Sequence, residues 1–417
     1  MMPRHGSLAA YGMLGMPLAM AALPVYVQAP AYYASQLGMA LSTTGAVLFF
    51  ARLVDTAQDP WLGRWIDHAV QQGRLAWLLG NAAIVLALAF AGLWLPPVRG
   101  GALVVWLAFM LILTYVAHSL INIAYLAWGA RLGQSAGPLT KAAAWREAAG
   151  LLGVVLASVL PVWLMRNPRF AAHTGMTAYA LLFAVLLLLG LWLLFRRAPA
   201  WHVHGVQQPS WHRAWRNRAF RRLLWPYFLN ALSVSIPATL AMFFIADRIA
   251  APGWSGIFLG VYFLAGAAGL PAWAWLADRI GVVAAWRHGM LLAVVAFVWA
   301  AMLGSGDSVP YLLVCALAGL TLGADLALPP VLLAQRIPPG EPPAGYYGVW
   351  TMLGKLALAL SGLMLPLLAQ LGYQPGLGDG RAGMALAVCY AGLPCVIKLL
   401  ALFVLRGIDD AGKEDVR

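Results

Sequence analysis

The chain has 417 residues, of which 62% are hydrophobic and only 10% are charged, and its mean hydropathy is +0.79. Ordinary soluble domains carry about 25% charged residues, so this composition excludes a water-soluble globular protein and indicates a chain embedded in lipid. The formal net charge is +13, and most of the excess lies in one central basic segment that suits an anionic lipid surface, so we expect no nucleic-acid partner.

Twelve apolar runs are long enough to cross a hydrocarbon core about 30 Å thick, which takes about 20 helical residues. The first run has no basic leader followed by a small-residue cleavage site, so we expect a retained helix and not a removed signal peptide. The predicted fold class is an all-α integral membrane protein with twelve transmembrane helices over residues 8–30, 39–66, 75–96, 101–131, 140–165, 174–195, 220–246, 254–277, 284–304, 308–336, 343–372 and 383–406.

The second run, ARLVDTAQDPWLGRWIDH, carries the most informative residues, Asp55 and Asp59. Positions i and i+4 share a helix face, so both carboxylates point one way into a setting where an unpaired charge is costly. A bound cation, a proton or a basic side chain from another helix must neutralise these carboxylates. We therefore predict a coupling site for sodium or a proton, with no other cofactor. Arg52 can pair with Asp55 along the helix, which favours a structural role.

The fourth and fifth runs hold further polar candidates. His118 and Asn122 share a face of the fourth run, and we interpret His118 as a hydrogen-bonded packing residue. Arg146 opens the fifth run, and its guanidinium fork suits sugar hydroxyls, carboxylates or phosphates. The alternative is that Arg146 simply pairs with Glu147 or another nearby carboxylate.

A basic segment, residues 196–219, divides the twelve runs into two sets of six, so the predicted domains are 1–195 and 220–417. Pro60 and Asp67 end the second run with the same spacing as Pro271 and Asp278 at the end of the eighth. This match predicts two six-helix repeats, the major facilitator architecture, with Asp67, Asp278 and Arg279 as gating or structural residues. Most arginines fall on one side of this topology, which places both termini in the cytoplasm and suggests the inner membrane.

The last runs contain three more ionisable residues. Asp325 precedes a helix break expected at Pro329 and Pro330, and we expect this segment to bend during gating. Lys355 lies midway along the eleventh run, too deep to snorkel, and the acidic pair of the second run is its natural counter-charge. The salt bridge between Lys355 and the acidic pair is either a permanent structural contact or a contact that breaks and forms as the cation binds. Lys398 lies near the inner end of the last run, where it can snorkel, and we interpret it as a structural residue.

The three cysteines, Cys315, Cys389 and Cys395, fall within predicted helices and imply neither a disulfide nor a metal site. An enzyme needs a nucleophile with a nearby base, or clustered metal ligands, and the runs supply neither. A passive channel needs a ring of like groups along a pore, which does not fit two unequal halves with one charged cluster. We therefore predict a transporter, with a non-transporting receptor or scaffold as an alternative.

The run ARLVDTAQDPWLGRWID resembles the second-helix signature of the glycoside-pentoside-hexuronide:cation symporters of the major facilitator superfamily. NIAYLAWGA, residues 122–130, is similar to the fourth-helix pattern of that family, and the segment around Arg146 and Lys355 in the eleventh helix match as well. The resemblance implies that Asp55 and Asp59 bind the cation, and we predict Asn122 and Lys355 as further residues of this coupling site.

The resemblance also implies that Asn122 and Arg146 contact the substrate, and we predict Tyr125 and Lys355 as further substrate-binding residues. Three departures weaken sugar recognition: Ala19 replaces an aspartate, Leu126 replaces a tryptophan that packs on the sugar, and Gln335 replaces a carboxylate. We therefore predict cation-coupled transport of a sugar or glycoside-like solute by alternating access, with a lysophospholipid or another amphiphile as the alternative. The predicted partners are this small molecule and the bilayer, with no obligate protein partner.

Overall fold

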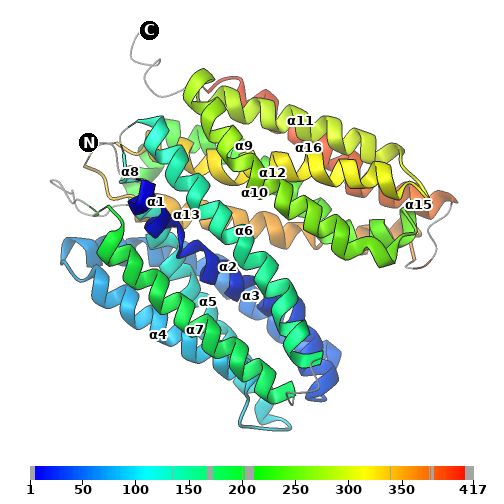
Figure 1. The fold of residues 1–417 in the computed structure, drawn as a ribbon, viewed down its shortest axis with the longest axis horizontal. Helices are drawn as coiled ribbons and strands as arrows, with labels where there is room; N and C mark the ends of the chain where they lie inside the picture. Colours follow the sequence, from blue (N-terminus) through cyan, green and yellow to red (C-terminus); the bar gives the residue numbers. More distant parts are fainter. Residues whose placement is uncertain are drawn as a thin grey trace. The chain divides into compact units, whose positions relative to one another are not determined.

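The computed structural model describes residues 5–133, 135–166, 172–199, 201, 211–338, 340–374, 376 and 380–408, and within these ranges the chain is helical and contains no strand (Figure 1). The α-helices are α1 His5–Gly12, α2 Gly15–Ala31, α3 Leu41–Gln71, α4 Leu75–Trp94, α5 Ala102–Gly129, α6 Ala136–Arg166, α7 Ala172–Arg197, α8 Trp211–Arg216, α9 Arg218–Phe243, α10 Ser255–Ile280, α11 Val282–Met302, α12 Ser308–Arg336, α13 Ala344–Ser361, α14 Met364–Gln370, α15 Gly380–Ala387 and α16 Leu393–Leu405. Short π-helical turns η1 (Tyr32–Gln36), η2 (Phe244–Arg248) and η4 (Val388–Gly392) and a 3-10 turn η3 (Pro252–Trp254) connect some of them.

Ten helical segments of the described chain are long and apolar enough to cross a membrane. They correspond to the third through twelfth predicted runs. α3 spans 31 residues but is interrupted by charged side chains, so it is not among the ten. The first predicted run is divided between α1 and α2, and the basic central segment, which the sequence indicates as a loop, contains the short helix α8. The predicted all-helical membrane fold is confirmed.

The helices gather into two compact units. The first contains residues 1–134, 145–211 and 338–352, and the second contains residues 135–144, 212–337 and 353–417. The first half of α13 therefore groups with α3, and the beginning of α6 groups with α10. The simpler division at the central segment, into 1–195 and 220–417, stays a prediction.

In the first unit, α4 packs along α5 and α7, and α3 packs along α5 (Figure 1). An aromatic contact between Phe90 and Phe183, with ring centroids 4.4 Å apart, joins α4 to α7. The Tyr33 hydroxyl donates to the carbonyl oxygen of Leu93 over 2.9 Å and so ties η1 to the end of α4. The buried hydroxyl is thus satisfied by a backbone oxygen, as a lipid-embedded core requires.

Glycines allow α3 and the first half of α13 to approach very closely. A methyl group in place of the Gly348 hydrogen would lie 2.5 Å from the backbone oxygen of Asp59, and one at Gly63 would meet the backbone oxygen of Ala344. Small residues at helix contacts let backbones approach, which is the usual way that membrane helices pack. The contact brings the backbone of α13 against α3 at the acidic residue itself.

In the second unit, α12 is central and packs against both α10 and α11, while α16 packs along α9 (Figure 1). The predicted helix break at Pro329 and Pro330 is wrong, because α12 runs through both prolines to Arg336. A proline inside a membrane helix removes a backbone donor, and neighbouring groups can satisfy the freed carbonyl oxygen. The aromatic cluster of this unit stacks Phe244 on Tyr390, with ring centroids 4.0 Å apart.

Candidate functional site

The acidic pair of α3, Asp55 and Asp59, is buried in the first unit, with exposed fractions of 1% at Asp55 and 0% at Asp59. Asp55 Oδ1 accepts hydrogen bonds from Ser119 Oγ over 3.1 Å and from Gln58 Nε2 over 3.3 Å. Both residues therefore lie in a place where charge is costly, and the Ser119 hydroxyl is close to Asp55. Such a setting suits a bound cation or proton.

Ser119 is a residue of this site that sequence reasoning missed. It lies on α5, is 2% exposed, and contacts Asp55 directly. Asn122 follows it by three residues, so the two share a side of α5, and Asn122 is partly buried. The signal was available, since a hydroxyl three residues before the candidate asparagine lies on the same face of a predicted helix. Gln58 was similarly detectable, three residues after Asp55.

Asp67 lies two turns after Pro60 on α3 and is 2% exposed. Its Oδ1 accepts from the backbone N–H of Ala344 over 2.9 Å, and its Oδ2 accepts from that of Gly345 over 2.7 Å. The first N–H groups of a helix have no partner within the helix, and the helix dipole favours negative charge there. Asp67 therefore holds the N-terminus of α13 against α3.

Asp278, the counterpart of Asp67 by sequence spacing, has a different environment in the second unit. Its side chain is exposed, and its Oδ1 lies 3.5 Å from Thr140 Oγ1 at the beginning of α6. Arg279 is also exposed, and its guanidinium lies 4.3 Å from the centre of the Trp275 ring. The equal spacing in sequence thus hides an unequal burial.

Arg146 is buried in the first unit, with an exposed fraction of 8%. Its Nη2 and Nε both donate to Glu147 Oε1, over 2.6 and 2.8 Å. Pairing with Glu147 is one of the two interpretations of the sequence, and it is what the structure contains. The pair uses two of the five N–H donors of the guanidinium, so it leaves donors for a further ligand.

Tyr125 and Tyr11 lie beside Arg146, with their ring centroids 4.6 Å apart. The Tyr125 hydroxyl donates to the backbone oxygens of Tyr11 and Gly12, over 2.7 and 3.0 Å. This side chain therefore ties α5 to α1. Its predicted contact with the substrate stays a prediction.

The remaining residues predicted around the acidic pair are partly buried. Arg52 lies one turn before Asp55 on α3. Lys355 lies on the second half of α13, in the second unit, two turns after Gly348. His118 Nε2 is 3.0 Å from the backbone oxygen of Leu18, which fits the predicted packing role and joins α5 to α2.

The predicted snorkelling of Lys398 to the inner interface is wrong. Its Nζ lies 2.6 Å from Asp325 Oδ2 inside the second unit, and both side chains are 5% exposed. Asp325 Oδ1 accepts in addition from Asn230 Nδ2 over 3.1 Å and from Trp286 Nε1 over 3.0 Å. The ammonium turns inward because a carboxylate that is already desolvated attracts it more strongly than one in water.

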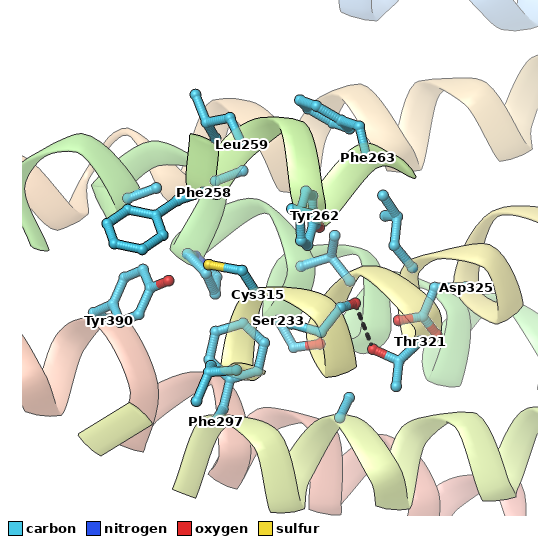
Figure 2. Close-up of a pocket in the computed structure, with 18 of the residues that line it drawn as sticks. Ser233, Phe258, Leu259, Tyr262, Phe263, Phe297, Cys315, Thr321, Asp325 and Tyr390 are labelled. Atoms are coloured by element: carbon cyan, nitrogen blue, oxygen red, sulfur yellow. Dashed lines mark hydrogen bonds between the residues drawn. The ribbon is translucent and has the colours of Figure 1, made fainter. Parts of the chain in front are cut away.

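This ion pair lies at one end of a cavity of about 280 Å³ in the second unit. Figure 2 shows Phe258 and Tyr390 at the opposite end from Asp325, with Tyr262 between them. Sequence reasoning did not find this cavity, because no short motif marks it. Its lining residues come from five helices and two π turns that only the fold brings together.

Among the residues that the structure describes, no group of three or more histidine, cysteine, aspartate or glutamate side chains is arranged to hold a metal ion. Ser119 and Gln58 are the oxygen-bearing side chains in contact with Asp55.

Residues 8–408 match the family described as MFS/sugar transport protein. The chain belongs to this family. No curated protein matches the chain. Members of the MFS/sugar transport protein family are membrane transporters, so this multi-pass membrane protein is a transporter by family and not an enzyme.

Solved structures with the same fold extend over nearly the whole chain. A bacterial homologue of the iron transporter ferroportin, in an outward-facing state, is 20% identical with a TM-score of 0.70, over 97% of this chain and 99% of its own. The E. coli fucose:proton symporter is 14% identical with a TM-score of 0.65, over 95% and 97%. A proton:xylose symporter of the major facilitator superfamily is 12% identical with a TM-score of 0.68, over 97% and 95%.

These likenesses show the major facilitator fold that the sequence predicted. Membership of the MFS/sugar transport protein family supports the superfamily. The narrower resemblance to the glycoside-pentoside-hexuronide:cation symporters stays a prediction, as do the roles of the individual site residues.

Proposed function

We propose that this protein is a cation-coupled secondary transporter that moves a sugar or glycoside-like solute by alternating access, with Asp55 and Asp59 as its coupling site. The observation that carries the proposal is the complete burial of these two carboxylates, one helical turn apart, beside the hydroxyl of Ser119. Two buried like charges repel each other, so a sodium ion or a proton bound there lowers their energy substantially. The family described as MFS/sugar transport protein supports a sugar-like substrate.

In the proposed cycle, a cation enters from the outer side and neutralises Asp55 and Asp59. Lys355 is then released from these carboxylates, and the substrate binds near Asn122 and Arg146, with Tyr125 beside them. The loaded protein closes outside and opens inside. Because binding free energies are reciprocal, the substrate tightens cation binding by the same factor by which the cation tightens substrate binding.

We further propose that the protein lies in the inner membrane with both termini in the cytoplasm, since the basic residues gather on segments of that side. Sodium or a proton is the only cofactor in this scheme. Asp67, Asp278 and Arg279 act at the inner ends of their helices, with Asp67 holding α13. No protein partner is required.

The test is a thermal-shift screen of the purified protein with glycosides and with lysophospholipids, in sodium, in choline and at two pH values. A ligand that binds only the folded state stabilises it by about 2.7 kcal/mol at a hundredfold excess over its Kd. We expect a shift with a glycoside that depends on sodium or on pH and is lost in Asp59→Asn. Asp278→Asn, which changes an exposed carboxylate, is the matched control and keeps the shift.

A glycoside shift of equal size with and without every candidate cation contradicts the coupling. Asp59→Asn that leaves every ligand response unchanged favours a receptor or scaffold over a transporter. A shift with lysophospholipids alone moves the substrate to the amphiphile class. The second candidate function is cation-coupled transport of such an amphiphile, and the apolar cavity beside Lys398 favours it.

A further inference from the structure

The cavity of the second unit is long for its small volume. Along α12, its lining runs from Tyr311 to Asp325, fourteen positions or about 21 Å at 1.5 Å per residue. Along α9 and the π turn that follows it, the lining runs from Ser233 to Ile245, which is about 18 Å. A volume of about 280 Å³ is at the lower limit for sites of compact ligands, which are about 300 to 1,000 Å³. A cavity of this volume that extends over this length is narrow, and it is called the channel below, in the sense of a ligand-binding cavity.

The wall of this channel offers few hydrogen bonds. Ser233 Oγ donates to the backbone oxygen of Asn230 over 2.7 Å, and Thr321 Oγ1 donates to that of Ala318 over 2.8 Å (Figure 2). The hydroxyls of Tyr311 and Tyr390 bond to each other over 2.8 Å. A sugar placed here would find few groups to replace the hydrogen bonds to water that its hydroxyls give up, which is costly for each hydroxyl left unpaired. A hydrocarbon chain gives up none.

One end of the channel is polar. Lys398 and Asp325 line it there, and the ammonium spends one of its three N–H donors on the carboxylate. Asp325 already accepts from Asn230, Trp286 and Lys398. The ammonium of Lys398 therefore provides hydrogen-bond donors at this end of the channel. Such an end suits a head group that bears acceptor oxygens.

The channel is reached through α9 and α10. Ala238 of α9 is exposed, and Val234 of α9 and Phe263 of α10 are half-buried, although all three line the cavity. Ala238 is the exposed one of the three and has the smallest side chain, so a ligand meets the least bulk at this position, which is called the passage below. A flexible chain can enter sideways through such a passage, whereas a rigid ring system of similar volume cannot.

We propose that this channel binds the single hydrocarbon chain of an amphiphile whose acceptor-bearing head group lies at Lys398. The shape, the mostly apolar wall and the polar end each point to the same ligand. The site lies in the second unit and does not involve Asp55 or Asp59. Its part in transport rests on the proposed function, through the amphiphile candidate, but binding of the chain does not depend on a cation gradient.

The experiment uses the full chain in lipid nanodiscs, because alkyl detergents would occupy the channel. A lysophosphatidylcholine with a diazirine in its chain is bound and irradiated, and the labelled residues are mapped by mass spectrometry. We expect label on the cavity-lining segments of α9, α10 and α12. Unlabelled lysophosphatidylcholine, fatty acid and alkyl glycoside of equal chain length compete, and their ranking identifies the head group. A sugar without a chain does not compete.

Two variants test the channel itself. Ala238→Phe closes the passage, and Ala318→Leu fills the middle of the channel, so each reduces the label in these segments at least about fivefold, as expected when bulk occupies the ligand's space. Val295→Phe is the matched control, because Val295 is 61% exposed on α11 and adds the same kind of bulk outside the cavity. All three are compared for thermal unfolding, so that loss of label is judged only on folded protein.

Label that is spread equally over the exposed helix faces, or that both cavity variants leave unchanged while folded, overturns the proposal. Asp59→Asn separates the two hypotheses, since it should abolish cation-dependent transport and keep the label. Label without any transport means that the chain site is right and the proposed function is wrong. Cation-dependent glycoside uptake without label means the reverse.

Discussion

Lys398 Nζ and Asp325 Oδ2 form a 2.6 Å ion pair that joins α16 to α12 inside the second unit, with both side chains nearly excluded from the surface. Desolvation of both charges offsets most of their attraction, so a buried pair of this kind stabilises little compared with apolar side chains of similar volume. Removing one partner is different, because the other charge is left buried and uncompensated.

The first prediction follows from this asymmetry. Lys398→Met should lower the free energy of unfolding by about 3–5 kcal/mol, the range for breaking a buried pair. The double variant Lys398→Met with Asp325→Leu should be less destabilised than the single variant, apart from the donors of Asn230 and Trp286 that it leaves unpaired. Thermal unfolding of the two variants and the parent measures both. If Asp325→Leu destabilises the Lys398→Met variant as much as it destabilises the parent, the two residues are not energetically coupled, which contradicts the prediction.

Asp67 provides the second prediction, together with its counterpart Asp278. Asp67→Ala leaves the buried N–H group of Ala344 and the partly buried one of Gly345 without their acceptor, and an unsatisfied buried donor costs about 1–3 kcal/mol. We expect Asp67→Ala to unfold at a clearly lower temperature. Asp278→Ala removes an exposed carboxylate and should change stability by less than about 0.5 kcal/mol. If Asp67→Ala and Asp278→Ala change the stability equally, the burial of Asp67 does not determine its contribution, and the prediction is wrong.

This pair also shows what the sequence could and could not predict. The apolar runs predicted the helices, since length and composition decide whether a segment can cross a bilayer. The repeated Pro and Asp spacing pointed to Asp67 and Asp278, which lie near the ends of α3 and α10. Their burial depends on which helix packs beside each one, and a single sequence does not contain that information.

The same limit explains Lys398 and Ser119. The place of Lys398 near the end of a predicted helix indicated a side chain at the interface, because depth along the helix was readable but the direction of the side chain was not. Asp55 was singled out because a carboxylate in an apolar run is conspicuous. Ser119 was passed over because serine is common in membrane helices and its hydroxyl can bond within its own helix. Only its contact with Asp55 distinguishes it.

Ser119 gives the third prediction. Ser119→Ala removes one hydrogen bond to a charged group, and such bonds contribute about 1.5–3 kcal/mol. If a cation is held beside Asp55, its half-saturating concentration should rise about tenfold or more, since tenfold corresponds to about 1.4 kcal/mol. Cation-dependent uptake in proteoliposomes measures this. Ser158→Ala is the control, because Ser158 is an exposed serine of α6 whose hydroxyl donates to Val154 of its own helix. A shift in the substrate dependence alone, with the cation dependence unchanged, would place Ser119 outside the coupling site.

The last prediction concerns Arg146, whose guanidinium uses two of its five N–H donors on Glu147. Arg146→Lys keeps the charge and the pairing with Glu147 but replaces the planar fork by a point charge. If Arg146 binds the substrate, the half-saturating substrate concentration should rise about tenfold, equivalent to about 1.4 kcal/mol, while the cation dependence and the unfolding temperature stay close to those of the parent. Arg248→Lys is the matched control, since Arg248 Nε donates to the backbone oxygen of Leu303 in the second unit. A purely structural Arg146 gives the opposite pattern: Arg146→Lys and Glu147→Gln both lower the unfolding temperature, and the substrate dependence of the folded fraction does not change.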